Sequence, residues 1–178
     1  MLRSTASRGL TSALHAAKQR LKPKERLESL FQLTPEWLQA RGLKGVILDL
    51  DNTVVPYKFR GEPTAELLAW VEGLKRAGVK LFLVSNARRK RLAYWSEKLG
   101  VAGTGLAFKP WFGFKKGLRR LGLSPREVVV VGDQLFTDVL GGNLAGLHTV
   151  LVPPLSRREL GYTRLVRRLE RWVLQQLG

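Results

Sequence analysis

The sequence Gly45-Val-Ile-Leu-Asp-Leu-Asp-Asn-Thr53 decides the predicted fold of this 178-residue chain. Residues 45–49 are predicted to form a buried strand, because an apolar run of this length, bounded by glycine and by a polar Asn-Thr pair, is typical of a central strand in a parallel sheet. Asp49 and Asp51 come at the end of that strand. Ligands of open α/β sheets bind beyond the carboxyl ends of the strands, so both carboxylates are candidates for a functional site.

Strand-like and helical patterns alternate along the rest of the chain. Apolar runs typical of strands occur at 80–84, 106–108, 128–131 and 148–152. Helical patterns lie between and around them: a short helix from Pro35 to Gly42, two helices that stop at Gly78 and Gly100, and further helices at 111–121, 137–145 and 156–177. This alternation predicts an α/β fold with a three-layer, Rossmann-like core, a mainly parallel five-stranded sheet and right-handed crossovers.

Polar side chains follow four of the five predicted strands. The residues at these ends are Asp49, Ser85, Lys109 and Asp133. The four aspartates of the chain all follow just two of the strands: Asp49, Asp51, Asp133 and Asp138. Because the carboxyl ends of parallel strands meet at one edge of a sheet, these groups are predicted to form a single site.

The predicted site combines carboxylates, one ammonium, the hydroxyls of Thr53 and Ser85, and the amide of Asn86. Carboxylates gathered at one edge repel each other unless a cation lies among them, and oxygen ligands without His or Cys indicate Mg²⁺. With Mg²⁺ and Lys109 neutralising a phosphate, one carboxylate can attack phosphorus while a second protonates the leaving oxygen and later activates water. The residues therefore predict phosphoryl transfer through an aspartyl-phosphate.

The order of these residues resembles the four motifs of the haloacid dehalogenase (HAD) superfamily. The motif residues are Asp49-Leu-Asp-Asn-Thr53, Ser85, Lys109 and Gly132-Asp133 followed by Asp138. The DxDxT form of the first motif resembles the phosphatase branch. The pairs Ser85-Asn86 and Lys109-Pro110, with the run through Gly-Gly-Asn143, are similar to the subfamily IIIA phosphatases of the YqeG type, which are related to mitochondrial phosphatidylglycerophosphate phosphatases. The resemblance covers residues 34–170.

The resemblance implies a catalytic role for three residues. Asp49 would be the nucleophile. Asp51 would be the general acid/base, with its backbone carbonyl on the metal. Lys109 would neutralise the phosphoryl group and orient Asp49.

The same resemblance implies the binding residues. The phosphate would be bound by Thr53, Ser85, Asn86 and Lys109. The Mg²⁺ would be bound by Asp49, Asp51, Asp133 and Asp138, although Asp138 matches an acid that binds either the metal or Lys109. Taken singly, each residue also fits a structural role, such as a turn, a helix cap or a surface lysine.

The size of the expected substrate follows from the lengths of two gaps. The segments from Thr53 to Ser85 and from Asn86 to Lys109 are too short for a cap domain, so the site is expected to be open. An open site and a net charge of +17 favour a large anionic substrate, and a lipid phosphate is the leading prediction. Phosphatidylglycerophosphate as that lipid follows from the resemblance alone.

Two other functions remain open at this point. A phosphatase for a soluble phosphate ester would use the positive charge only for steering. A nucleic-acid or ribosome-associated module on a HAD scaffold would use the basic run 88–91 together with Trp95 and Trp111. The oligomeric state is not predicted.

The chain divides into a basic N-terminal extension at 1–33 and a capless hydrolase domain at 34–178. Residues 1–24 contain no acid and resemble a basic amphipathic helix, which predicts peripheral membrane contact there or through 156–177. The alternatives for residues 1–24 are a solvated terminus and a mitochondrial transit peptide. Without an apolar run long enough to span a bilayer, the protein is expected in the cytoplasm or on the inner face of the membrane.

Overall fold

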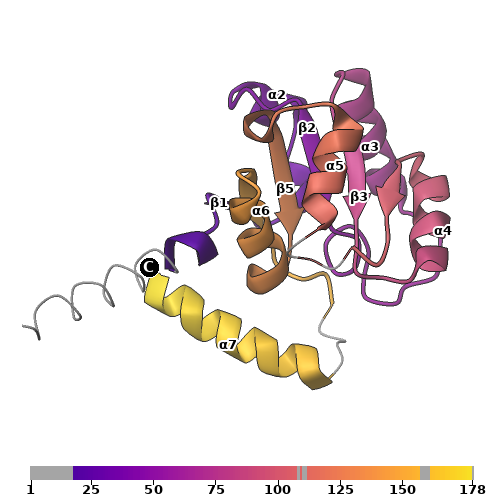
Figure 1. The fold of residues 1–178 in the computed structure, drawn as a ribbon. Helices are drawn as coiled ribbons and strands as arrows, with labels where there is room; N and C mark the ends of the chain where they lie inside the picture. Colours follow the sequence, from indigo (N-terminus) through magenta and orange to yellow (C-terminus); the bar gives the residue numbers. More distant parts are fainter. Residues whose placement is uncertain (1–17, 108, 110–111, 157–160, 178) are drawn as a thin grey trace, which may run out of the picture.

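The computed structural model describes residues 18–107, 109, 112–156 and 161–177. Within these residues a single parallel sheet has the strand order β1-β6-β5-β2-β3-β4 (Figure 1). Its strands are β1 (Glu25–Arg26), β2 (Gly45–Leu48), β3 (Lys80–Val84), β4 (Gly103–Thr104), β5 (Val128–Gly132) and β6 (His148–Leu151). The strand that carries the first motif, β2, lies between β5 and β3 and is therefore central, as predicted.

Helices cover both faces of the sheet and complete three layers (Figure 1). The labelled regular helices are α2 (Pro35–Gln39), α3 (Ala65–Arg76), α4 (Arg89–Leu99), α5 (Gly113–Leu121), α6 (Leu140–Leu144) and α7 (Gly161–Leu177), and residues 18–21 are also helical. Short turns of other helix types are η1 (Leu30–Gln32), η2 (Pro125–Glu127) and η3 (Leu135–Val139), of which η3 is a π-helix.

Alternate residues of β2 point to opposite layers. Val46 and Leu48 pack in a core with the buried residues of α3 and α4, whereas Ile47 packs with those of α5. All the residues of β2 are buried, as expected for a strand covered on both faces.

Local sequence signals fix the ends of several helices. The side chains of Thr34 and Thr64 accept hydrogen bonds from Trp37 N and Leu67 N, both at 3.2 Å, and so cap α2 and α3. Helix α4 ends at Gly100, whose φ of 58° lies in the left-handed region that glycine adopts without strain.

The predicted strand at 106–108 is wrong for residues 106 and 107, because the edge strand forms earlier, at Gly103–Thr104, while residue 108 lies outside the described residues. Gly103 pairs with Leu83, and a Cβ at Gly103 would lie 2.7 Å from Leu83 Cβ, so this close register depends on glycine. Leu106 has a φ of 49°, which no strand residue adopts. The predicted helix at 137–145 starts earlier, with η3, and residue 156 precedes α7 rather than belonging to it.

The sixth strand, β1, and the packing that surrounds it were not predicted. Glu25 and Arg26 pair with Val150 and Leu151 of β6, and two nearby leucines are buried in the core: Leu30 and Leu33. Packing against the sheet thus begins earlier in the chain than the predicted start of the domain at residue 34. Most of the predicted N-terminal amphipathic helix, residues 1–17, lies outside the described residues.

The described residues contain neither a cap domain next to the motifs nor a membrane-spanning helix. Residues 54–84 contain a loop, α3 and β3, and residues 87–107 contain α4 and β4, so neither segment includes a cap domain. Of the helices described, none combines the length and the apolar character that crossing a bilayer requires.

Candidate active site

The candidate site lies at the carboxyl ends of β5, β2 and β3, which are neighbours in the sheet. Asp133 follows β5, Asp49 follows β2, and Ser85 follows β3. Asp49 N donates to Val131 O at 3.0 Å, so pairing with β5 continues up to the carboxylate itself. The parallel sheet thus brings together groups that are far apart in the sequence, as predicted.

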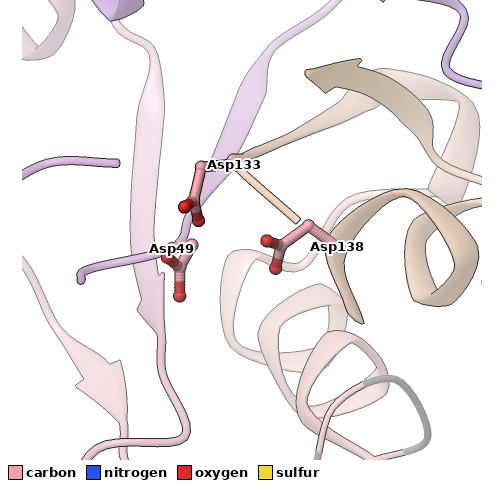
Figure 2. Close-up of side chains that lie close together, drawn as sticks. All are labelled: Asp49, Asp133 and Asp138. Atoms are coloured by element: carbon pink, nitrogen blue, oxygen red, sulfur yellow. The ribbon is translucent and has the colours of Figure 1, made fainter. Parts of the chain in front are cut away.

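Three aspartates form a buried cluster: Asp49, Asp133 and Asp138 (Figure 2). One carboxylate oxygen from each lies within 4.8 Å of the others, and all three residues are buried. Gly132 makes this approach feasible, because a Cβ there would lie 2.2 Å from Asp138 Cγ. Backbone N of Gln134 donates to Asp138 Oδ2 at 3.1 Å and fixes that carboxyl at the start of η3.

Lys109 extends into the cluster and bonds two of its carboxylates. Lys109 Nζ lies 2.5 Å from Asp49 Oδ1 and 2.7 Å from Asp138 Oδ1. Burial lowers the pKa of Lys109, but Asp138 and Asp49 outweigh that effect and leave the pKa above its ordinary value, so the ammonium is ionised. Asp138 thus contacts Lys109, one of the two partners that the sequence left open for it, and it also belongs to the aspartate group that could hold a metal.

Burial and the neighbouring lysine shift the pKa of Asp49 in opposite directions. Burial raises the pKa of Asp49 to about 6, while the Lys109 ammonium acts in the opposite direction. Three carboxylates around one ammonium leave an excess of negative charge, which a further cation would offset. An all-oxygen donor set without His or Cys fits a hard metal ion such as Mg²⁺.

Three polar residues organise the cluster and its rim. Thr53 Oγ1 lies within hydrogen-bond distance of both Asp49 Oδ2 (3.1 Å) and Asp133 Oδ1 (3.3 Å). Ser85 Oγ is buried and accepts from Ala87 N at 3.0 Å, which leaves its own proton for another acceptor. The Asn86 side chain accepts from Lys109 N at 3.0 Å and so anchors the backbone that carries the lysine.

Asp51 is not one of the three clustered aspartates, and its carboxylate pairs with Arg91 of α4. Arg91 Nη2 and Nε lie 2.6 Å and 3.0 Å from Asp51 Oδ1. This partner was not predicted, because in the sequence Arg91 is one residue of a basic run at 88–91. The motif residues thus form a buried group around Asp49 and an Asp51–Arg91 pair, and the Asp51 charge also raises the pKa of Asp49.

Asn52, which directly follows Asp51, joins two loops, and this role was not predicted. Its φ is 67°, a left-handed conformation that asparagine tolerates better than most residues. Its side-chain oxygen accepts from Tyr57 N and from Ser156 Oγ, and its backbone oxygen accepts from Leu155 N. The segment before α7 is therefore tied directly to the first motif.

A comparison with curated proteins identifies the family. The probable phosphatase YqeG of Bacillus subtilis is 42% identical over 156 residues, which cover 87% of this chain and 90% of that protein. This chain belongs to the HAD superfamily. A family model described as "HAD-hyrolase-like" matches residues 109–154, the part with Lys109, Asp133 and Asp138. The resemblance predicted from the four motifs is confirmed, and the protein groups with the HAD phosphatases.

More distant relatives include a lipid phosphatase. Phosphatidylglycerophosphate phosphatase 1 of Arabidopsis thaliana is 30% identical over 167 residues, which cover 86% of this chain and 47% of that protein. This HAD chain therefore spans about half the length of that relative. Among solved structures, the cobalt-bound deoxy-D-mannose-octulosonate 8-phosphate phosphatase of Haemophilus influenzae aligns with a TM-score of 0.53 at 14% identity, over 78% of this chain and 91% of that one. That likeness confirms the HAD-like α/β fold.

Proposed function

We propose that this HAD phosphatase is Mg²⁺-dependent, that it acts through an aspartyl-phosphate on Asp49, and that its substrate is phosphatidylglycerophosphate. The observation that carries the chemistry is the buried contact of Asp49 with Lys109 inside a cluster of three aspartates. Asp49, Asp133 and Asp138, with the Asp51 backbone carbonyl, are the proposed Mg²⁺ ligands. The ion would supply positive charge to the transferring phosphoryl oxygens.

The reaction proceeds in two balanced steps. An Asp49 oxygen attacks phosphorus, the bond from phosphorus to the leaving oxygen breaks, and Asp51 donates a proton to that oxygen. Asp51 then takes a proton from water, which attacks the aspartyl-phosphate and releases inorganic phosphate with Asp49 restored. Lys109 neutralises the phosphoryl oxygens, and Ser85 and Thr53 orient them with their hydroxyls.

A lipid substrate is supported by the surface of α7. Arg168, Leu169, Arg171 and Trp172 are exposed on this helix, and Leu169 and Trp172 are 52% and 58% exposed. Arginine beside tryptophan and leucine is typical of helices that lie in the interface of an anionic bilayer. The absence of a cap domain between residues 54 and 107, where the chain is described, leaves room for a headgroup presented by a membrane.

The position of α7 relative to the site also supports a lipid substrate. Figure 1 shows α7 beyond the carboxyl ends of β3 and β5, and Asp49 and Asp133 directly follow the carboxyl ends of β2 and β5. Backbone N of Phe136 in η3 donates to Glu170 Oε1 at 3.1 Å, so α7 is joined to the element that carries Asp138. A membrane bound by α7 would therefore lie near the open site. The 30% identical phosphatidylglycerophosphate phosphatase supports the choice of lipid.

The nucleic-acid alternative has less support. Trp95, one of the two aromatic residues on which it depended, is fully buried and cannot stack on a base. Arg91 of the basic run is paired with Asp51. The second aromatic residue, Trp111, lies outside the described residues.

The decisive experiment measures Mg²⁺-dependent phosphate release from phosphatidylglycerophosphate in mixed micelles, beside soluble phosphate esters, with Asp49→Asn as the control. Turnover of the lipid well above that of the soluble esters, abolished by the substitution and by chelation of Mg²⁺, is the expected result. Turnover of soluble esters alone would assign the protein to the soluble-ester alternative. If neither were hydrolysed, the proposed activity would be wrong, and salt-dependent RNA binding would be measured next.

A further inference from the structure

Arg91 makes more contacts than a simple ion pair with Asp51 requires. Besides the carboxylate, its guanidinium donates to Phe59 O at 2.6 Å and to Pro56 O at 3.4 Å. The side chains of Arg91 and Asp51 are 19% and 20% exposed, so an incoming ligand can reach both. One arginine from α4 thus joins the proposed general acid/base to the loop that follows the first motif.

The position of Asp51 places Arg91 on the leaving-group side of the site. A general acid must come within hydrogen-bond distance, about 3 Å, of the oxygen that it protonates. Since Arg91 contacts the same carboxylate at 2.6 Å, its guanidinium lies within reach of groups next to the leaving oxygen. While Arg91 occupies Asp51 Oδ1 through two nitrogens, it competes with a leaving oxygen for that atom.

We propose that Arg91 is a specificity-determining residue that binds a second anionic group carried by the leaving group of the substrate. The substrate class is then a phosphomonoester whose leaving group contains another phosphate, such as a phosphodiester one glycerol away. The planar guanidinium suits a phosphate better than a lysine would, because it donates two parallel hydrogen bonds. When the second anion draws Arg91 away, Asp51 is released to meet the leaving oxygen. This inference rests on the proposed function and names the residue that would select its substrate.

The test compares two lipids with identical short acyl chains under soluble conditions. Phosphatidylglycerophosphate has a leaving group with a phosphodiester anion, whereas phosphatidic acid has an uncharged diacylglycerol leaving group. Arg91→Gln is expected to lower kcat/KM for the first about 10- to 100-fold, the range for loss of a charge-assisted hydrogen bond, mainly through KM. For phosphatidic acid, whose leaving group has no anion to draw Arg91 away, kcat/KM is expected not to fall, because the substitution itself releases Asp51 from Arg91.

Two further variants serve as controls. Lys90→Gln removes the same charge from an exposed neighbouring position in α4 and is expected to leave the ratio of the two kcat/KM values unchanged. Arg91→Lys retains the charge without the planar fork and is expected to recover part of the preference. An equal loss for both lipids in Arg91→Gln would overturn the inference and leave Arg91 as a support for the loop.

A binding measurement separates this inference from the proposed function. In an Asp49→Asn background, calorimetric titration with each lipid is expected to show tighter binding of phosphatidylglycerophosphate, and Arg91→Gln is expected to abolish that difference. Equal affinities with Arg91 present would overturn the inference, whatever the activity of the wild-type protein. Failure of the wild-type protein to hydrolyse either lipid, with the binding preference intact, would refute the phosphatase proposal alone.

Discussion

Two carboxylate–cation pairs form at the end of β2, and they differ in their access to solvent. The pair of Asp49 with Lys109 has side chains only 8% and 4% exposed, and Asp138 bonds the same lysine. The pair of Asp51 with Arg91 is about one-fifth exposed and includes loop carbonyls. A buried ion pair keeps its geometry, because separating its members would leave a buried charge without a partner. An accessible ion pair can exchange partners, because water can solvate each charge. The first therefore suits a fixed nucleophile and the second a group that must move.

The largest expected effect on stability comes from breaking the buried pair. Lys109→Met leaves Asp49 and Asp138 buried without their cation and is expected to lower the free energy of unfolding by about 3–5 kcal/mol, measured by urea denaturation without Mg²⁺. The matched control is Lys98→Met, which breaks an exposed pair with Glu62 and is expected to have little effect. Similar losses in the two variants would contradict the distinction between buried and accessible pairs.

Mg²⁺ is expected to stabilise the folded protein through the buried aspartate cluster and not through the Asp51–Arg91 pair. Mg²⁺ at about 100 times its Kd should raise the free energy of unfolding by about 2.7 kcal/mol, since it binds the folded state alone. Thermal unfolding with and without Mg²⁺ measures this increase. Asp133→Asn should abolish the increase, and Arg91→Gln should retain it. Loss of the Mg²⁺ effect in Arg91→Gln would mean that the two regions act as one.

The close approach of Asp138 to β5 gives a smaller effect. In Gly132→Ala the new Cβ would meet the Asp138 carboxyl at 2.2 Å, so either the strand end or the carboxyl must shift, at a cost of about 1–3 kcal/mol. Urea denaturation and Mg²⁺ affinity measure the consequence. Gly73→Ala in α3 is the control, because nothing lies within 4 Å of its added Cβ, and it is expected to stabilise the protein by up to about 1 kcal/mol. An unchanged Mg²⁺ affinity in Gly132→Ala would show that the Asp138 position is not critical.

The smallest effect is expected at the accessible pair. Arg91→Gln should lower the free energy of unfolding by only about 1 kcal/mol, because water can solvate the Asp51 carboxylate that remains. Urea denaturation beside Lys109→Met gives the direct comparison. A loss as large as that of Lys109→Met would identify Arg91 as a structural residue first.

Much of the site was predictable because its residues directly follow the carboxyl ends of strands. Asp49, Ser85 and Asp133 follow β2, β3 and β5, and in a parallel sheet those ends meet whatever the loops between them do. The contact between Lys109 and Asp49 agrees with the orienting role that the family resemblance implied. By contrast, the short strands were missed or misplaced: β1 has a polar Glu-Arg sequence, and β4 pairs through Gly103. Neither strand has an apolar run to reveal it, because each is only two residues long and lies at an edge of the sheet.

The sequence by itself determined the parallel α/β fold, the family and the gathering of the motif residues, because each depends on local patterns and on the order of strands. Only the tertiary structure decided that Asp138 contacts Lys109, that Trp95 is buried and that Arg91 forms an ion pair with Asp51. The last contact joins residues 40 positions apart and depends on how α4 packs beside the loop after β2. A basic run in a sequence does not show which of its side chains faces a carboxylate, since that direction is set by packing.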